Sequence, residues 1–205
     1  MIAVCAATKG RPKKLLDMVS TVPAEIPIYL YGTCLADFDE VRGFPNIFMW
    51  HGELSIIKAN NFLIKKALGD NPNVSVTVGC DDIEYEEGAF DGLLKSLEKD
   101  NSLMYGLQCR NMECKDDAFV LFSNAILRET QGSPYHEEYL HFYADTELGD
   151  YYKGQRRFKV ADAWIINHHP VVTGVEDETH KFKRSWKLRH DREVYESRNV
   201  HNATV

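Results

Sequence analysis

The first hundred residues alternate between short apolar runs and longer stretches whose apolar positions lie three or four residues apart. The short runs are rich in β-branched and aromatic residues, and they predict strands over 2–7, 26–31, 47–50 and 74–78. The longer stretches predict helices over 13–19, 55–68 and 87–97. Strands that alternate with helices in this way are typical of a parallel, doubly wound sheet with helices on both faces.

The second half of the chain follows a less regular pattern. It predicts strands over 102–109, 118–122 and 157–167, and helices over 123–130 and 145–153. We find neither an internal repeat nor a linker, and 205 residues suit one domain of ordinary size. We therefore expect a single α/β domain over residues 1–205, built on a sheet flanked by helices.

Composition places the chain among folded, water-soluble proteins. Hydrophobic residues make up 44% and charged residues 27%, which is the range of a globular domain. The longest apolar runs are far shorter than the roughly 20 residues of a membrane span, and the apolar residues 1–7 are too few for a signal peptide. The five cysteines form no C-x-x-C pair, so we expect reduced thiols and a cytoplasmic protein.

Charge is distributed unevenly along the chain. The net charge of -7 disfavours a general nucleic-acid binder. Residues 180–192, however, hold six Lys and Arg against one Asp, so this window carries +5 and the rest of the chain -12. Phe182 and Trp186 stand between the basic residues, and such a strip could lie along phosphate groups. It could equally be a solvated basic terminus.

Three acids follow the strand predicted over 74–78, whose apolar character places it centrally in the sheet. Asp81, Asp82 and Glu84 would then lie in the crevice beyond the carboxyl ends of the strands, where open α/β sheets bind ligands. Mg²⁺ or Mn²⁺ would allow these like charges to stand side by side, with waters and diphosphate oxygens as further ligands. The alternative is a solvated turn that caps the following helix.

Other candidate side chains lie near the ends of predicted elements. His168 and His169 close the last strand and could bind the same cation or a phosphate, although a surface or core histidine is the alternative. Asp145 precedes a short helix, so it could be an N-cap or a general base. The loop 8–11 offers backbone N–H groups and a cation to a nucleotide or phosphate. Its single glycine lacks the spacing of a Walker loop or a Rossmann fingerprint, which disfavours an NTPase or a dehydrogenase.

The order of these motifs resembles the nucleotide-diphospho-sugar transferases of the GT-A fold, and more closely the small family 2-like glycosyltransferases of phages and bacteria. The resemblance extends over residues 2–180, and it implies a Rossmann-like α/β fold with a mixed, mainly parallel sheet flanked by helices. Four segments carry it, namely Ala7-Thr8-Lys9-Gly10-Arg11-Pro12, Lys58-Ala59-Asn60-Asn61, Cys80-Asp81-Asp82, and Asp145-Thr146-Glu147-Leu148 with Gly154 after it. They are similar, in that order, to the family's nucleoside-binding loop, its basic helix segment, its D-x-D metal site and the stretch that holds the base of inverting members.

The resemblance implies a role for each candidate residue. Nucleotide contacts are implied for Ala7, Thr8, Lys9, Arg11, Lys58, Asn61 and Asp81. A Mn²⁺ or Mg²⁺ ion is implied on Asp82, with His168 and His169 as further ligands. Asp145, or else Glu147, would be the catalytic base. In the basic tail 180–205 we expect contacts to the diphosphate or the acceptor from Lys181, Lys183, Arg184 and Lys187. Residues 1–100 would form the nucleotide-binding half and residues 101–179 the acceptor half.

The implied activity is a metal-dependent transfer of a sugar from a nucleotide-diphosphate sugar, with a UDP-sugar as the expected donor, to an acceptor hydroxyl. Phage members of the broad family glycosylate hydroxymethylated bases in DNA, so such a base is one candidate acceptor, and a saccharide or protein hydroxyl is another. Two other classes stay open: a nucleotidylyltransferase of the same fold, and a non-catalytic nucleotide-binding or interaction module. The expected location is the cytoplasm, that of the host if the protein is phage-encoded, and the oligomeric state is left open.

Overall fold

A computed structural model describes residues 1–111, 117–169 and 184–202. Its centre is a sheet of eight strands in the order β3-β2-β1-β4-β7-β6-β8-β5. The strands are β1 (Ile2–Ala7), β2 (Ile28–Gly32), β3 (Ile47–His51), β4 (Ser75–Cys80), β5 (Ile83–Tyr85), β6 (Met104–Cys109), β7 (Val120–Phe122) and β8 (Phe158–Asn167).

The sheet is mixed and mainly parallel, which confirms the expectation from the sequence. β1 lies between β2 and β4 and is parallel to both, and β3 is parallel to β2. β7 runs antiparallel between β4 and β6, whereas β8 is parallel to β6. The hydrophobic pattern did not predict β5, a three-residue strand that returns antiparallel along the end of β8. This short return brings the segment after β4 next to the end of β8.

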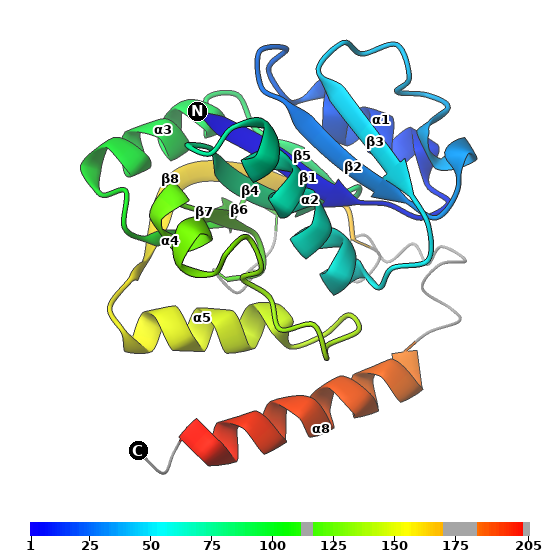
Figure 1. The fold of residues 1–205 in the computed structure, drawn as a ribbon. Helices are drawn as coiled ribbons and strands as arrows, with labels where there is room; N and C mark the ends of the chain where they lie inside the picture. Colours follow the sequence, from blue (N-terminus) through cyan, green and yellow to red (C-terminus); the bar gives the residue numbers. More distant parts are fainter. Residues whose placement is uncertain (112–116, 170–183, 203–205) are drawn as a thin grey trace.

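Helices cover both faces of the sheet (Figure 1). One face packs against α1 and α3, and the other against α2, α4 and α5, so the core has two layers. Leu15 and Leu93 are fully buried in the first layer, and Leu63 and Leu127 in the second. The helices are α1 (Pro12–Ser20), α2 (Ile56–Asp70), α3 (Ala89–Lys99), α4 (Asn124–Glu129) and α5 (Ala144–Gly154), with a short 3-10 helix η1 (Leu35–Phe38) after β2.

The C-terminal segment, expected from the sequence to be a basic tail, forms a long helix over its described part. This helix, α8 (Arg184–Asn202), lies alongside α5 (Figure 1). Asp191, a residue of α8, is fully buried, and its carboxylate accepts hydrogen bonds from the backbone N–H groups of Leu140, His141 and Phe142 at 2.7 to 2.9 Å. Three donors on one carboxylate fix α8 to the loop that leads into α5.

The structure bears on two features of the composition, namely the apolar runs and the cysteines. No helix among the described residues combines the length and apolar character that a membrane span requires. Cys5, Cys34 and Cys80 are free thiols, but Cys109 is disulfide-bonded, so the expectation of five reduced thiols is wrong at that position. A covalent pair of this kind leaves no signature in the spacing of the cysteines, because the chain between two bonded cysteines can have any length that brings them together.

Candidate functional site

Two segments far apart in the sequence meet at the carboxyl ends of β1 and β4. These strands are parallel neighbours, with Ala7 opposite Cys80, so the loop after β1 and the acids after β4 emerge side by side. Asp81 and Asp82, called here the acidic pair, are both buried. The hydroxyl of Thr8 donates a hydrogen bond of 2.6 Å to Asp81 Oδ2. The structure therefore brings together two motifs that the sequence analysis predicted as nucleotide contacts.

Arg11 joins both members of the acidic pair. Its Nη2 lies 2.5 Å from Asp81 Oδ1, and its Nη1 donates to Asp82 Oδ2 at 3.0 Å. The arginine side chain is only 15% exposed, so these ion pairs lie in a region largely withdrawn from water. The remaining oxygen, Asp82 Oδ1, accepts from the Cys80 thiol at 2.7 Å. Three of the four carboxylate oxygens therefore accept a hydrogen bond from this chain, and Asp81 Oδ1 is held by the ion pair with Arg11 alone.

The two carboxyl groups of the acidic pair differ in their electrostatics. Burial raises the pKa of Asp81 to about 6, against the lowering influence of Arg11 and Thr8. Burial also opposes ionisation of Asp82, but the Cys80 hydrogen bond and the charge of Arg11 hold the pKa of that carboxyl below its usual value. Asp82 is therefore the carboxyl group of the pair that stays ionised more readily. Its negative charge would attract a cation or a positively charged group of a ligand.

Asp37, in η1 after β2, organises the loop that carries Arg11. One of its carboxylate oxygens accepts from the backbone N–H of Gly10 at 2.7 Å, and the other from Thr33 and from the backbone N–H of Cys34. Gly10 has a φ of +64°, a conformation that glycine adopts without strain. Sequence reasoning missed Asp37. Its position just beyond the carboxyl end of β2, the neighbour of β1, was the available signal.

The end of β8 supplies the third side of the site. The backbone N–H of His168 donates to the carbonyl oxygen of Asp82 at 2.7 Å, and His168 Nε2 lies 2.9 Å from Glu84 Oε1. The Lys14 ammonium donates to the His168 carbonyl oxygen at 3.4 Å. The charges of His169 and Lys14 both contribute to the lowered pKa of Asp82. The two predicted histidines therefore lie beside the acidic pair.

The remaining residues predicted as nucleotide contacts lie in different environments. Ala7 is half-buried at the end of β1, while Lys9 and Lys58 are exposed. Asn61 is buried in α2, where its amide exchanges hydrogen bonds with the backbone of Tyr135 and donates to Glu137. Its hydrogen-bonding groups are therefore engaged with the loop before α5.

The two acids predicted to act as base lie in the first turn of α5. Asp145 is half-buried, its Oδ1 accepts from the backbone N–H of Thr146, and its charge adds to burial in raising the pKa of Tyr135. Asp145 is thus placed near Tyr135, on the side of the fold that α2 and α5 share. Glu147 forms a short ion pair with Arg198 of α8, and this contact occupies the glutamate.

Only part of the predicted basic strip can be placed. Lys181 and Lys183 lie outside the described residues, and Arg184 begins α8. Lys187 is half-buried, with its ammonium 6.0 Å from the centre of the Trp186 ring, and Trp186 is 59% exposed. The helix that carries these residues is anchored on the α5 side of the molecule by Asp191.

The acidic pair suits a hard divalent cation in its chemistry, because Mg²⁺ and Mn²⁺ prefer oxygen ligands and often take only one or two carboxylates plus phosphate oxygens. Within the described ranges, no three His, Cys, Asp or Glu side chains are grouped to hold a metal. Two carboxylates fit such an ion once the guanidinium of Arg11 leaves them. The metal site on Asp82, His168 and His169 stays a prediction.

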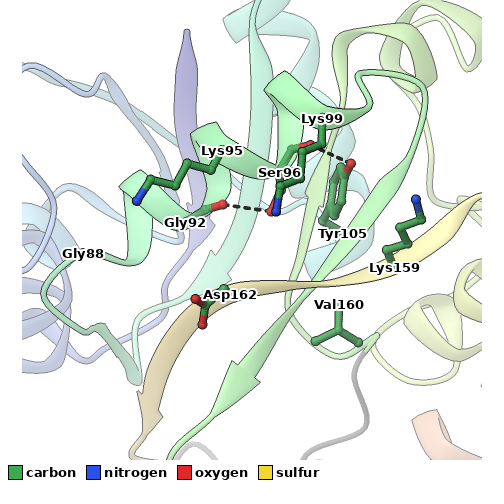
Figure 2. A pocket seen from close by; sticks show the side chains of 9 residues that line it. All are labelled: Gly88, Gly92, Lys95, Ser96, Lys99, Tyr105, Lys159, Val160 and Asp162. Carbon is green, nitrogen blue, oxygen red and sulfur yellow. Dashed lines mark hydrogen bonds between the residues drawn. The ribbon is translucent and has the colours of Figure 1, made fainter.

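A separate hollow of about 360 Å³ lies between α3 and the first half of β8 (Figure 2). Three lysines line it, namely Lys95, Lys99 and Lys159. The hydroxyls of Ser96 and Tyr105 are already bonded to backbone carbonyl oxygens. Asp162, also in its wall, precedes His168 by six residues, about 20 Å along a strand. This hollow is therefore distinct from the site at the acidic pair.

The fold of this chain is similar to that of solved structures, although its sequence is very different from theirs. No protein-family model and no curated protein matches the sequence. The structure of S. aureus TarS 1–349 in complex with UDP-GlcNAc superposes with a TM-score of 0.61 at 12% identity, covering 86% of this chain and 61% of that one. A structure of S. aureus TarS gives a TM-score of 0.61 at 13% identity, covering 82% and 37%, and TarS 1–349 in complex with UDP gives 0.56 at 12%, covering 82% and 58%.

The chain thus spans less than two thirds of each of these three TarS chains. At such low identity the likeness concerns the path of the chain and the arrangement of its elements. The protein has the GT-A fold, as the order of its motifs indicated.

Proposed function

We propose that this protein is a glycosyltransferase that uses a nucleotide-diphosphate sugar. The observation that carries the proposal is the buried acidic pair at the carboxyl end of β4, held by Thr8 and Arg11 of the loop after β1, in a chain with the GT-A fold. Buried carboxylates at this edge of an α/β sheet are costly to keep for structure alone, and they lie where such sheets bind ligands.

The chemical task of the site is to stabilise the negative charge that grows on the diphosphate as its bond to the sugar breaks. Arg11 and Lys14 place basic groups beside the acidic pair for this purpose, and the exposed Lys9 belongs to the same loop as Arg11. A divalent cation, when bound, would supply further positive charge to the leaving diphosphate. Asp82 would hold it, with His168 and His169 at the same edge.

A UDP-sugar is the donor that we propose. The support comes from the structural neighbours, because TarS 1–349 has been solved in complex with UDP-GlcNAc and with UDP. The loop from Thr8 to Arg11 and the basic side chains around it would contact the nucleoside and its phosphates, with Asp81 oriented by Thr8.

The acceptor is proposed to be a hydroxyl group presented on the α5 side, with Asp145 as the base that removes its proton. Asp145 is the better candidate of the two acids in that helix, because Glu147 is neutralised by Arg198. A hydroxymethylated base in DNA stays one proposed acceptor, and a saccharide or a protein hydroxyl stays another.

Ionic strength separates these acceptors. Binding to a duplex with hydroxymethylated bases should weaken steeply between low and high salt, because each neutralised phosphate releases counterions. Lys187→Ala combined with Arg189→Ala should reduce that slope, since both residues lie in the described part of the basic strip. No binding at low salt would remove DNA as the acceptor and leave saccharide and protein.

A donor-hydrolysis screen tests the proposed activity. The full chain would be incubated with UDP-, GDP- and TDP-sugars in the presence of Mn²⁺, and release of the nucleotide would be measured. We expect slow hydrolysis of a UDP-sugar, lost in Asp82→Ala and retained in Asp17→Asn, a control acid that is exposed on α1.

The same screen distinguishes the other classes. Formation of a nucleotide sugar from a sugar phosphate and a nucleoside triphosphate would identify a nucleotidylyltransferase instead. Nucleotide binding without any turnover across donors and acceptors would favour a binding module.

A further inference from the structure

A positively charged side chain of the protein itself, that of Arg11, forms ion pairs with both carboxylates of the acidic pair. The guanidinium of Arg11 contacts Asp81 through one nitrogen and Asp82 through the other. Thr8 and Cys80 bind the remaining two carboxylate oxygens. The pair is neutralised in part before any ligand arrives, and both acids are buried.

A divalent cation cannot simply join this arrangement. The ion would need the oxygens that Arg11 already uses, and in a region of low dielectric two positive groups a few ångströms apart repel each other strongly. Removing the guanidinium without a replacement partner is also unfavourable, because an unpaired charge would be left partly buried. Entry of the cation therefore requires a second anion that takes over Arg11.

A diphosphate is the anion that suits this exchange. The planar fork of an arginine binds phosphate oxygens as well as it binds carboxylates, so Arg11 can trade one set of partners for the other. Arg11 immediately precedes Pro12, the first residue of α1, so its guanidinium is carried by the loop between β1 and α1, at the carboxyl ends of the strands. Lys14, one turn further along α1, reaches the same edge and adds positive charge for a phosphate.

We propose that Arg11 is an internal counter-ion that keeps divalent cations off the acidic pair until a nucleoside diphosphate takes the guanidinium, so that cation and nucleotide bind as one unit. This inference rests on the proposed function, since it concerns the same site. It assigns Arg11 the role of a binding residue that couples the two ligands.

The test measures Mn²⁺ binding to the full chain without nucleotide, by the electron paramagnetic resonance signal of free Mn²⁺. Wild type should bind the ion weakly, and Arg11→Gln should bind it at least about tenfold more tightly, because the competing charge is gone. Arg42→Ala is the matched control: it removes an arginine whose ion pair with Asp39 is exposed, and it should leave Mn²⁺ affinity unchanged. Equal Mn²⁺ affinities in wild type and Arg11→Gln would overturn the proposal.

A second measurement uses wild type alone and does not depend on the folding of the variant. UDP should raise the affinity for Mn²⁺ by at least about tenfold, and Mn²⁺ should raise the affinity for UDP by the same factor, because coupling is reciprocal. In a folded Arg11→Gln the coupling should shrink. UDP affinity that is the same in EDTA and in Mn²⁺ would overturn the inference and leave the proposed function standing. Absence of UDP and UDP-sugar binding under both conditions would instead contradict the proposed function.

Discussion

At the scale of single residues, the site depends on acids whose partners lie elsewhere in the chain. The sequence analysis predicted Thr8, Arg11, Asp81 and Asp82 as candidates from their positions after two predicted strands. It did not predict that Arg11 bridges both acids, because that contact follows from the pairing of β1 with β4 and from the direction of individual side chains. Asp37 escaped notice for the same reason, since its importance lies in a hydrogen bond to Gly10 across 27 residues.

Replacing Asp37 tests this organisation. Asp37→Asn should lower the free energy of unfolding at pH 7 by about 1–3 kcal/mol, because the amide offers one acceptor oxygen to donors that two anionic oxygens now bind. Backbone donors lower the pKa of Asp37 in the folded state despite its burial. The ionised Asp37 therefore stabilises the folded protein at pH values above the pKa of an ordinary aspartate. This contribution is lost as the pH falls through the lower pKa that Asp37 has in the folded state.

Urea unfolding of both proteins at pH 7 and at a pH below 3 is the measurement. The difference between wild type and Asp37→Asn should be larger at pH 7. A difference that does not change with pH would mean that the charge of Asp37 contributes nothing to stability.

Asp145 supports a second prediction at this scale. Asp145→Asn should reduce transfer to the acceptor by about 10²-fold or more while UDP binding and stability stay near wild type, because only the basic oxygen is lost. Glu147→Gln is the comparison: it removes the charge opposite Arg198 and should affect the docking of α8 more than turnover. If Asp145→Asn turns over at the wild-type rate, the base is another group or no protein side chain.

At the scale of elements, hydrophobic periodicity predicted the strands and helices whose apolar faces enter the core. The helices α1, α2 and α3 all follow that pattern, as do the long strands β1, β4 and β8. The pattern missed β5, which has only three residues, and gave no helix over 184–202. Val194 and Tyr195 of α8 pack against the core, and polar contacts to α5 and to the loop before α5 also hold the helix. The hydrophobic pattern did not predict α8, because its sequence is rich in charged residues.

Asp191→Ala should therefore weaken the attachment of α8 to the rest of the molecule, although it replaces only one side chain. The substitution leaves three backbone N–H groups without their acceptor, and we expect a loss of about 3 kcal/mol in unfolding stability. Limited proteolysis should also cut the loop 136–143 sooner than in wild type. Arg189→Ala, an exposed position on the same helix, is the control. Unchanged stability and cleavage in Asp191→Ala would show that other contacts hold α8.

At the scale of the whole molecule, the alternation of strands and helices predicted an α/β sheet with helices on both faces, but it predicted neither β5 nor the antiparallel direction of β7. The order β3-β2-β1-β4 then places the loop after β1 against the acids after β4, and the antiparallel return of β5 along β8 adds His168. The sequence could suggest these three segments separately. Their convergence depends on strand order and register, which no local pattern determines.

The measurement that tests the central claim most directly is calorimetric titration of the full chain with UDP in the presence of Mn²⁺, for wild type and Asp82→Ala, with Asp17→Asn as the control. A nucleotide-sugar transferase with its site at the acidic pair should bind UDP in wild type and in the control, and should lose this metal-dependent binding in a folded Asp82→Ala. UDP binding with an unchanged dependence on Mn²⁺ in Asp82→Ala, or no UDP binding in wild type, would contradict the account.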